Sequence, residues 1–237
     1  MTISLLDTLN VRYRRLRVAS NLHRMDTLRA MHRAWAYVHA TVLPGDYYEF
    51  AVYKDNSLIN SWLSQQHFRR RLEHSDKLPF ARTGTVANFL ARKPTFYGFD
   101  TFEGMPDNSE GEDALASGSF QCAIADVTHR CAVAGLVSPT VRLIPWLFAE
   151  TKSQIGPAQA AIVHIDCDLY QSTVDALDSI APLTQGTVLL FDDYNLFRAD
   201  KRRGERRALT EFTLKTGLTL DPWFSYGPAA QAFLCHE

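Results

Sequence analysis

The chain has 237 residues, of which 46% are hydrophobic and 22% charged, with a formal net charge of −1. This length suits one α/β domain, and the near-neutral charge gives no electrostatic reason to expect a nucleic acid or a membrane as partner. Its four cysteines form no C-x-x-C pair, so neither a zinc site nor a thioredoxin-like motif is indicated. No apolar run approaches the ~20 residues of a membrane span. We expect a cytoplasmic protein with reduced thiols, whose partner is a small molecule.

The N-terminal part of the chain reads as a helical extension. From Thr2 to about Thr41, apolar residues recur at helical spacing on a face opposite many arginines. The arginines at positions 12 to 17 permit an anionic ligand, but we favour a solvated helix or one that forms a subunit contact. The chain is therefore divided into an extension, 1–42, and a main domain, 43–237. We expect a homo-oligomer held through the N-terminal helices.

Strands and helices alternate after the turn at Pro44-Gly45-Asp46. Short apolar or β-branched runs predict strands over 47–52, 95–99, 141–144, 160–165 and 188–191. Helices are expected over 57–71, 127–134, 173–180 and 206–216, and an antiparallel pair over 220–224 and 232–234. Such alternation predicts an α/β fold with a doubly wound, mostly parallel sheet and helices on both faces.

Carboxylates follow directly after several of the predicted strands. Ligands of an open parallel sheet bind beyond the carboxyl ends of the strands, so Glu49, Asp100, Asp166 and Asp192 are expected on one rim. If the strands before Asp166 and Asp192 are neighbours, about 4.8 Å apart, their carboxylates can share a site. Clustered negative charges require a proton or a cation. Carboxylate oxygens suit Mg²⁺, Mn²⁺ or Ca²⁺ better than zinc.

Two aspartates near this rim depend on local backbone geometry. Asp193 can reach the same ion as Asp192 only if the chain leaves the pleat there, because successive strand residues point to opposite faces. Tyr194-Asn195 is consistent with such an exit, and the alternative is a turn with solvated aspartates. Asp168, with Gln171 three residues later, has the pattern of a capping box. We therefore interpret Asp168 as a helix N-cap rather than a ligand.

Four motifs, in this order, resemble the macrocin O-methyltransferase family: Gly45–Lys54, Tyr97–Pro106, His164–Thr173 and Asp192–Tyr194. The resemblance runs, with gaps, from about Leu43 to about Gly217. It implies a class I, Rossmann-like methyltransferase fold. It also implies that S-adenosylmethionine donates a methyl group to a sugar hydroxyl, with Mg²⁺ (or Mn²⁺) as the metal.

The same resemblance implies roles for particular residues. Asp166, Asp192 and Asp193 would bind the metal, with Asp166 also the general base for the acceptor hydroxyl. Asp100 would accept the ribose hydroxyls of the cofactor. The other implied cofactor-binding residues are Glu49, Ala51, Val52, Tyr53, Ser57 and Phe102. We expect a saccharide or glycoside with vicinal hydroxyls that chelates the ion. A catechol meets the same requirement, so the choice of a sugar rests on the resemblance.

The chain departs from the family at three places. Ala51 and Asp55 stand where the family has glycine, which permits positive φ and close approach to the cofactor. Pro145-Trp146 also stands where glycine is expected, so adenine contacts are not assigned. These changes leave open a catalytically silent binding protein. A nicotinamide oxidoreductase is disfavoured, since no G-x-G-x-x-G follows the first strand. The basic segment 195–203 is either a substrate loop or a solvated connector.

Overall fold

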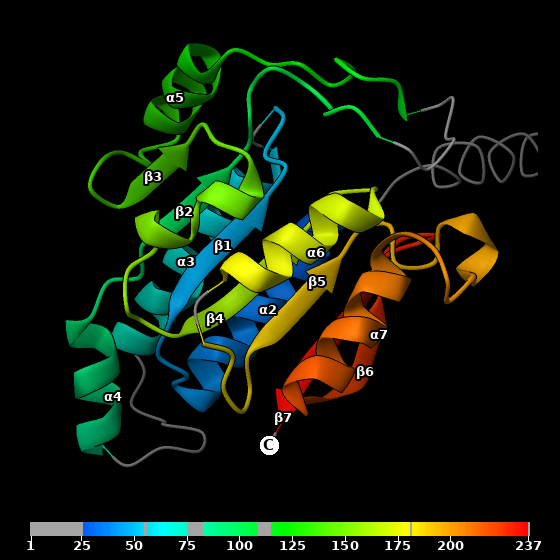
Figure 1. Ribbon diagram of the computed structural model, residues 1–237. Coiled ribbons are helices and arrows are strands. Elements are labelled where there is room, and N and C mark those ends of the chain that lie inside the picture. The colour runs from blue at the N-terminus through cyan, green and yellow to red at the C-terminus, as the bar shows by residue number, and fades with distance from the viewer. Residues whose placement is uncertain (1–25, 55, 75–82, 109–114, 181, 237) are drawn as a thin grey trace, which may run out of the picture.

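A mixed seven-stranded sheet in the order β3-β2-β1-β4-β5-β7-β6 forms the centre of the protein (Figure 1). The computed structural model describes residues 26–54, 56–74, 83–108, 115–180 and 182–236. Strands β1 to β5 pair in parallel, whereas β7 runs antiparallel to both of its neighbours, β5 and β6. The predicted sheet, including its antiparallel end, is confirmed.

The strands are β1 (Asp46–Phe50), β2 (Phe96–Phe99), β3 (Val141–Ile144), β4 (Ala160–Ile165), β5 (Val188–Phe191), β6 (Thr219–Ser225) and β7 (Gln231–His236). β1 ends two residues earlier than predicted because Ala51 has φ 67° and leaves the extended conformation. At the other end of β1, a Cβ atom on Gly45 would lie 2.4 Å from the backbone nitrogen of Ala161. Glycine therefore allows β1 to approach β4.

Helices cover both faces of the sheet (Figure 1). The α-helices are α2 (Thr27–Thr41), α3 (Asn56–Glu73), α4 (Thr83–Ala91), α5 (Ile124–Val133), α6 (Tyr170–Ser179) and α7 (Gly204–Thr216). Side chains of α2, α3 and α5 join the core on one face, and those of α6 and α7 join the core on the other. On β5, Leu190 belongs to the first core and Leu189 to the second. The central strands β1, β2, β4 and β5 are thus buried on both faces, as in parallel sheets generally.

Short 3-10 turns and α4 complete the secondary structure. The turns are η2 (Phe148–Glu150), η3 (Lys152–Gln154) and η4 (Phe197–Ala199). The sequence patterns did not predict α4, whose nine residues are too few for a clear periodic signal. Within the ranges that the structure describes, no helix has both the length and the apolar character to cross a bilayer.

The described part of the N-terminal extension packs within the core. Met31, Trp35 and Val38 of α2 are at most 1% exposed. Trp35 Nε1 donates a 2.7 Å hydrogen bond to Ser61 Oγ on α3. Leu28, in the first turn of the same helix, is 55% exposed. The arginines at positions 12 to 17 lie outside the described residues. The subunit contact and the boundary at residue 42 stay predictions.

Candidate active site

The carboxyl ends of four parallel strands lie at one level of the sheet. Phe50 on β1 pairs with Phe99 on β2 and with Ile165 on β4, and Ile165 pairs with Phe191 on β5. The residues that follow these four positions, in spatial order from β2 to β5, are Asp100, Ala51, Asp166 and Asp192. The register therefore brings Asp100, Asp166 and Asp192 to one rim, as expected from parallel pairing. Glu49, expected with them, instead lies within β1 and is fully buried.

A cavity of about 580 Å³ opens at this rim. Four of the predicted site residues line it: Ala51, Tyr53, Asp100 and Asp166. The other predicted residues do not: Glu49, Val52, Ser57, Phe102, Asp192 and Asp193. Much of the remaining wall comes from Gly104–Asn108, Phe120 and Leu147–Ala149, to which the sequence patterns assigned no role. These segments lie in connections, where no periodicity marks them.

Asp100 forms hydrogen bonds with the loops that follow β1 and β2. Its Oδ2 accepts a 2.9 Å hydrogen bond from the backbone nitrogen of Tyr53, and its Oδ1 accepts one of 2.7 Å from that of Phe102. Burial raises the pKa of the Asp100 carboxyl, although both N–H groups oppose this shift. A carboxylate that lines the cavity from a strand end is suitably placed to accept hydrogen bonds from the two hydroxyls of a diol.

The loop after β1 requires an unusual backbone conformation. Ala51 has φ 67° and Tyr53 φ 45°, in the left-handed region that favours glycine. This accounts physically for the glycine that the family resemblance leads one to expect at position 51. Val52, only 3% exposed, packs into the core, where its Cγ2 would lie 2.9 Å from a Cβ on Gly98. The loop thus turns Ala51 and Tyr53 to the cavity and Val52 away from it. Asp55 lies outside the described residues.

A buried polar network runs beneath the cavity. Glu49 is fully buried, where its Oε2 accepts from Tyr47 Oη at 2.5 Å and its Oε1 from Ser57 Oγ at 2.6 Å. His164 Nδ1 lies 3.7 Å from Glu49 Oε2, while Nε2 donates to Asp192 Oδ1 at 2.8 Å. Burial disfavours a charged imidazole, but the carboxylates of Asp192 and Glu49 outweigh it and raise the pKa of His164 well above its ordinary value.

Four aspartates form an acidic cluster at the ends of β4 and β5: Asp166, Asp168, Asp192 and Asp193. Burial first, and then the charge of Asp192, raise the pKa of Asp166 well above its ordinary value. Burial and the neighbouring Asp193 raise the pKa of Asp168 to about 8. The chain leaves the pleat after Asp192, and the Asp193 carbonyl accepts a turn hydrogen bond from the backbone nitrogen of Leu196 (2.9 Å). The exit that the sequence required is present.

The capping-box interpretation of Asp168 is wrong. Helix α6 has Leu169 as its N-cap residue, without a side-chain cap hydrogen bond. Asp168 has φ 56° and lines the cavity, and its carboxyl is hydrogen-bonded to that of Asp193. The left-handed backbone directs this side chain to the neighbouring strand end. Asp168 therefore belongs to the acidic cluster.

The acidic cluster suits a divalent cation in its chemistry. Buried carboxylates that raise one another's pKa are relieved by a proton or a cation, and hard oxygens suit Mg²⁺. In the structure Asp193 is hydrogen-bonded to Asp168, and Asp192 is hydrogen-bonded to His164 through one oxygen. Among the described residues, no group of three or more His, Cys, Asp or Glu side chains is placed to hold an ion. An ion bound by Asp193 would therefore have to displace the proton in the hydrogen bond between Asp168 and Asp193.

Glu205, near the start of α7, is a buried residue that the sequence patterns did not single out. Its Oε1 accepts a hydrogen bond from the backbone nitrogen of Cys167 (3.2 Å), and its Oε2 accepts one from that of Asp193 (3.0 Å). Burial, and then the charge of Asp193, raise the pKa of Glu205 well above its ordinary value. One carboxyl group thus links the chain just beyond β4 to the chain just beyond β5.

The basic segment 195–203 does not line the cavity. It contains η4, in which Phe197, Arg198 and Ala199 all have positive φ, from 56° to 58°. Arg203 lies over the Phe197 ring, 4.3 Å from its centroid. Asp200 pairs with Arg202 at 2.9 Å. A substrate-loop role for this segment stays a prediction.

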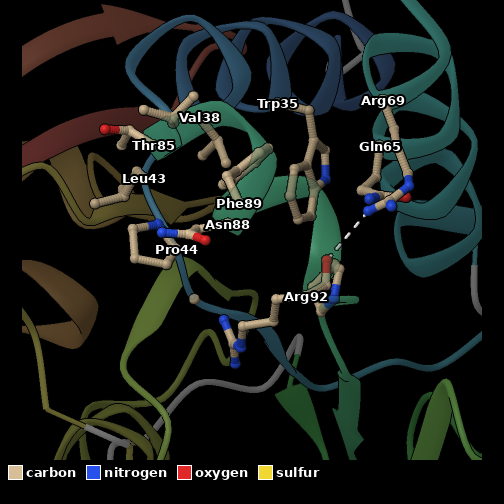
Figure 2. Close-up of a pocket in the computed structure, with 13 residues that line it drawn as sticks. Trp35, Val38, Leu43, Pro44, Gln65, Arg69, Thr85, Asn88, Phe89 and Arg92 are labelled. Carbon is tan, nitrogen blue, oxygen red and sulfur yellow. Dashed lines mark hydrogen bonds between the residues drawn. The ribbon is translucent and has the colours of Figure 1, made fainter. Parts of the chain in front are cut away.

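A second cavity, of about 190 Å³, lies at the opposite end of the sheet (Figure 2). Trp35 of α2 and Phe89 of α4 form apolar walls, and Pro44 lies just before β1. At its edge Arg69 Nη1 donates to the carbonyl of Arg92 (3.1 Å). None of the predicted site residues lines this cavity. The rim cavity is therefore the candidate active site.

A parallel sheet with an antiparallel β7, and a cavity at the carboxyl rim, defines the class I methyltransferase fold, which three solved structures of two proteins share. The O-methyltransferase NovP has a TM-score of 0.65 and 18% identity, covering 87% of this chain and 78% of NovP. The calicheamicin methyltransferase CalS11 has a TM-score of 0.64 and 21% identity, covering 99% and 94%. A second CalS11 structure, described as a TDP-rhamnose 3'-O-methyltransferase, has a TM-score of 0.56 at 21% identity, covering 99% and 96%.

Sequence comparison identifies the family within this fold. Residues 83–221 match the family described as Macrocin-O-methyltransferase (TylF), and the chain belongs to it. A relative from Streptomyces olivaceus is named 8-demethyl-8-(2,3-dimethoxy-alpha-L-rhamnosyl)-tetracenomycin-C 4'-O-methyltransferase. It is 31% identical over 104 residues, a stretch that spans 40% of this chain and 40% of the relative. The family predicted from the four motifs is confirmed.

Proposed function

We propose that this protein transfers a methyl group from S-adenosylmethionine to a hydroxyl of a saccharide or glycoside acceptor. The observation that carries the proposal is the rim cavity, which both Asp100 and Asp166 line. One carboxylate serves the cofactor ribose and the other serves the acceptor. Family membership over residues 83–221 supports the methyl donor. The rhamnosyl relative, rather than the cavity itself, supports a sugar over a catechol.

The chemistry assigned to this cavity is a direct displacement. The acceptor oxygen forms a bond to the methyl carbon as the carbon–sulfur bond breaks, and S-adenosylhomocysteine leaves. The hydroxyl proton goes to Asp166, which lines the cavity beside the rest of the acidic cluster. Because the sulfonium needs no further activation, the protein has to align the reacting atoms and remove one proton.

We further propose that Asp166, Asp192 and Asp193 hold Mg²⁺ or Mn²⁺ during turnover. The ion would polarise the acceptor hydroxyl and lower its pKa. Mg²⁺ rarely takes all six ligands from protein, so vicinal hydroxyls of the acceptor can complete its coordination. The support is the donor chemistry of the cluster, in which buried carboxylates repel one another.

An acceptor panel tests the proposed function. TDP-rhamnose, rhamnosyl glycosides, their analogues lacking the neighbouring hydroxyl, and catechol are incubated with S-adenosylmethionine and Mg²⁺, and S-adenosylhomocysteine release is measured. Turnover of a sugar with vicinal hydroxyls, reduced by orders of magnitude for the deoxy analogue, is expected. Equal rates on a sugar and on its deoxy analogue would rule out chelation of the metal by vicinal hydroxyls. If only catechol is methylated, the acceptor is a catechol and not a sugar. If the cofactor binds but no compound is methylated, the protein is the catalytically silent alternative.

A further inference from the structure

Asp192 is held by one of its two carboxylate oxygens. Its Oδ1 accepts both a 2.8 Å hydrogen bond from His164 Nε2 and a 2.5 Å hydrogen bond from Tyr226 Oη. Its Oδ2 has no hydrogen-bond partner among the residues that the structure describes. The Asp192 side chain is only 3% exposed. Both donors therefore fix the same oxygen and leave the other one available.

The donors reach Asp192 from two different parts of the fold. His164 lies within β4, and its side chain is fully buried under the rim. Tyr226 directly follows β6 and is 6% exposed, so the antiparallel end of the sheet brings its hydroxyl to the end of β5. Neither residue lines the rim cavity. Their contact with the acidic cluster is the Asp192 carboxylate.

The other edge of the His164 ring faces the strand that leads to the predicted cofactor loop. Nδ1 has no hydrogen bond, and the nearest carboxylate oxygen recorded is Glu49 Oε2 at 3.7 Å. Glu49 is itself fixed by Tyr47 and Ser57. The buried His164 ring thus lies between the carboxyl groups of Glu49 and Asp192. The imidazole limits the orientations open to this carboxylate.

We propose that His164 is a positioning residue. With Tyr226 as its helper, it holds Oδ1 of Asp192 beneath the rim, so that Oδ2 is the oxygen offered to a cation or an acceptor bound at the acidic cluster. The inference rests on the proposed function for the identity of that ligand. The orientation of Asp192 itself depends only on the hydrogen bonds described above.

Four variants test the proposal. His164→Leu removes both ring nitrogens, whereas His164→Gln keeps one N–H that can reach Asp192. Tyr226→Phe removes only the second donor. His39→Leu is the matched control, because His39 is also buried, at 4% exposure, but belongs to α2. Its hydrogen bond within the described residues goes to the carbonyl of Trp35 (2.8 Å). Each variant is examined by crystallography, by calorimetry with S-adenosylhomocysteine, and by kcat and KM on the best acceptor of the panel.

His164→Leu should reorient the Asp192 carboxylate in the crystal and lower kcat roughly tenfold to hundredfold, the range typical of residues that orient a ligand. Tyr226→Phe should lower kcat several-fold, and His164→Gln should recover most of the loss. S-adenosylhomocysteine affinity should be unchanged throughout, and His39→Leu should keep the wild-type kcat.

An Asp192 carboxylate that keeps its orientation in His164→Leu would overturn the proposal, as would an unchanged kcat. Equal loss in His164→Leu and His164→Gln would also overturn it. If His164→Leu does not fold, the Gln and Phe variants decide by the same two readouts. If the wild-type protein methylates nothing in the panel, the proposed function fails, while the crystal structures still decide the orientation of Asp192.

Discussion

Glu205 Oε2 accepts a 3.0 Å hydrogen bond from the backbone nitrogen of Asp193, so α7 fixes the chain just after β5. The same carboxyl group accepts from the backbone nitrogen of Cys167, just after β4. It thus sets the separation between two strand ends that carry all four clustered aspartates. A single side chain outside the cluster controls the spacing of the cluster.

Glu205→Ala should therefore destabilise the protein strongly. The change leaves two backbone N–H groups without their acceptor in a region where Glu205 itself is only 1% exposed. Each such group costs about 1 to 3 kcal/mol, so a loss of roughly 2 to 5 kcal/mol is expected in urea denaturation. Glu211→Ala on the exposed side of the same helix should stay within about 0.5 kcal/mol of wild type. Equal effects of the two changes would contradict this role.

Asp100→Ala should weaken cofactor binding. A charge-assisted hydrogen bond is worth about 1.5 to 3 kcal/mol, so the affinity for S-adenosylhomocysteine, measured by calorimetry, should fall roughly tenfold or more. The change also releases the backbone nitrogens of Tyr53 and Phe102. Asp178→Ala, an exposed aspartate paired with Lys215, serves as control and should leave the affinity unchanged. Wild-type affinity in Asp100→Ala would mean that the ribose binds elsewhere.

Ala51→Gly should stabilise the protein. Ala51 has φ 67°, where an alanine costs roughly 1 to 2 kcal/mol, partly offset by the greater chain entropy of glycine when unfolded. A net gain of up to about 1 kcal/mol is expected in urea denaturation. Ala132→Gly, within the exposed face of α5, should instead cost about 1 kcal/mol. A loss of stability in Ala51→Gly would show that the methyl group makes a compensating contact.

His39 should make stability fall as the pH is lowered below neutrality. Burial lowers the pKa of His39 from 6.5 to about 4. Between these values the unfolded chain binds a proton at this site and the folded protein does not, so acid favours unfolding. The contribution of neutral His39 to the free energy of unfolding is therefore present above about pH 6.5. About 2 kcal/mol of that free energy is lost between pH 7 and pH 5. His39→Leu should flatten this part of the pH–stability curve. Identical curves for wild type and variant would contradict the lowered pKa.

Chelation should abolish methyl transfer if the acidic cluster holds a cation. After dialysis against EDTA, turnover on the best acceptor should disappear and should return with Mg²⁺ or Mn²⁺. Binding of Mn²⁺ can be followed separately by electron paramagnetic resonance, where Asp193→Asn should weaken it by about tenfold or more. Asp178→Asn is again the exposed control. Full activity in excess EDTA would exclude the metal.

The centre of the sheet could be predicted from sequence because β1, β2, β4 and β5 are short, largely apolar runs that are buried on both faces. The run from Ala160 to Ile165 is fully buried in the structure, so its composition reports its environment directly. Helix α4 was missed because nine residues carry little periodic signal. Strand ends were less certain, since the left-handed backbone at Ala51 is set by the loop and not by residue type.

The sequence predicted site residues correctly where a carboxylate directly follows a predicted strand. Asp100 and Asp166 follow directly from parallel pairing, which places strand ends at one rim. Glu205 was not predicted because its partners are backbone nitrogens from distant segments, which leave no mark in the sequence around it. Asp168 was misread for a similar reason. A helix cap and a left-handed turn favour the same residue types. At Asp168 the left-handed turn is present, and the side chain contacts Asp193 at the end of β5.

The wall formed by Gly104–Asn108 and Phe120 is built separately from the sheet. Met105 closes it by two backbone hydrogen bonds, donating to the Ser119 carbonyl (2.8 Å) and accepting from the nitrogen of Gly118 (2.9 Å). Substitutions here change the shape of the cavity without altering the register of any strand. The wall of the cavity can therefore be varied independently of the strand ends that place Asp100 and Asp166.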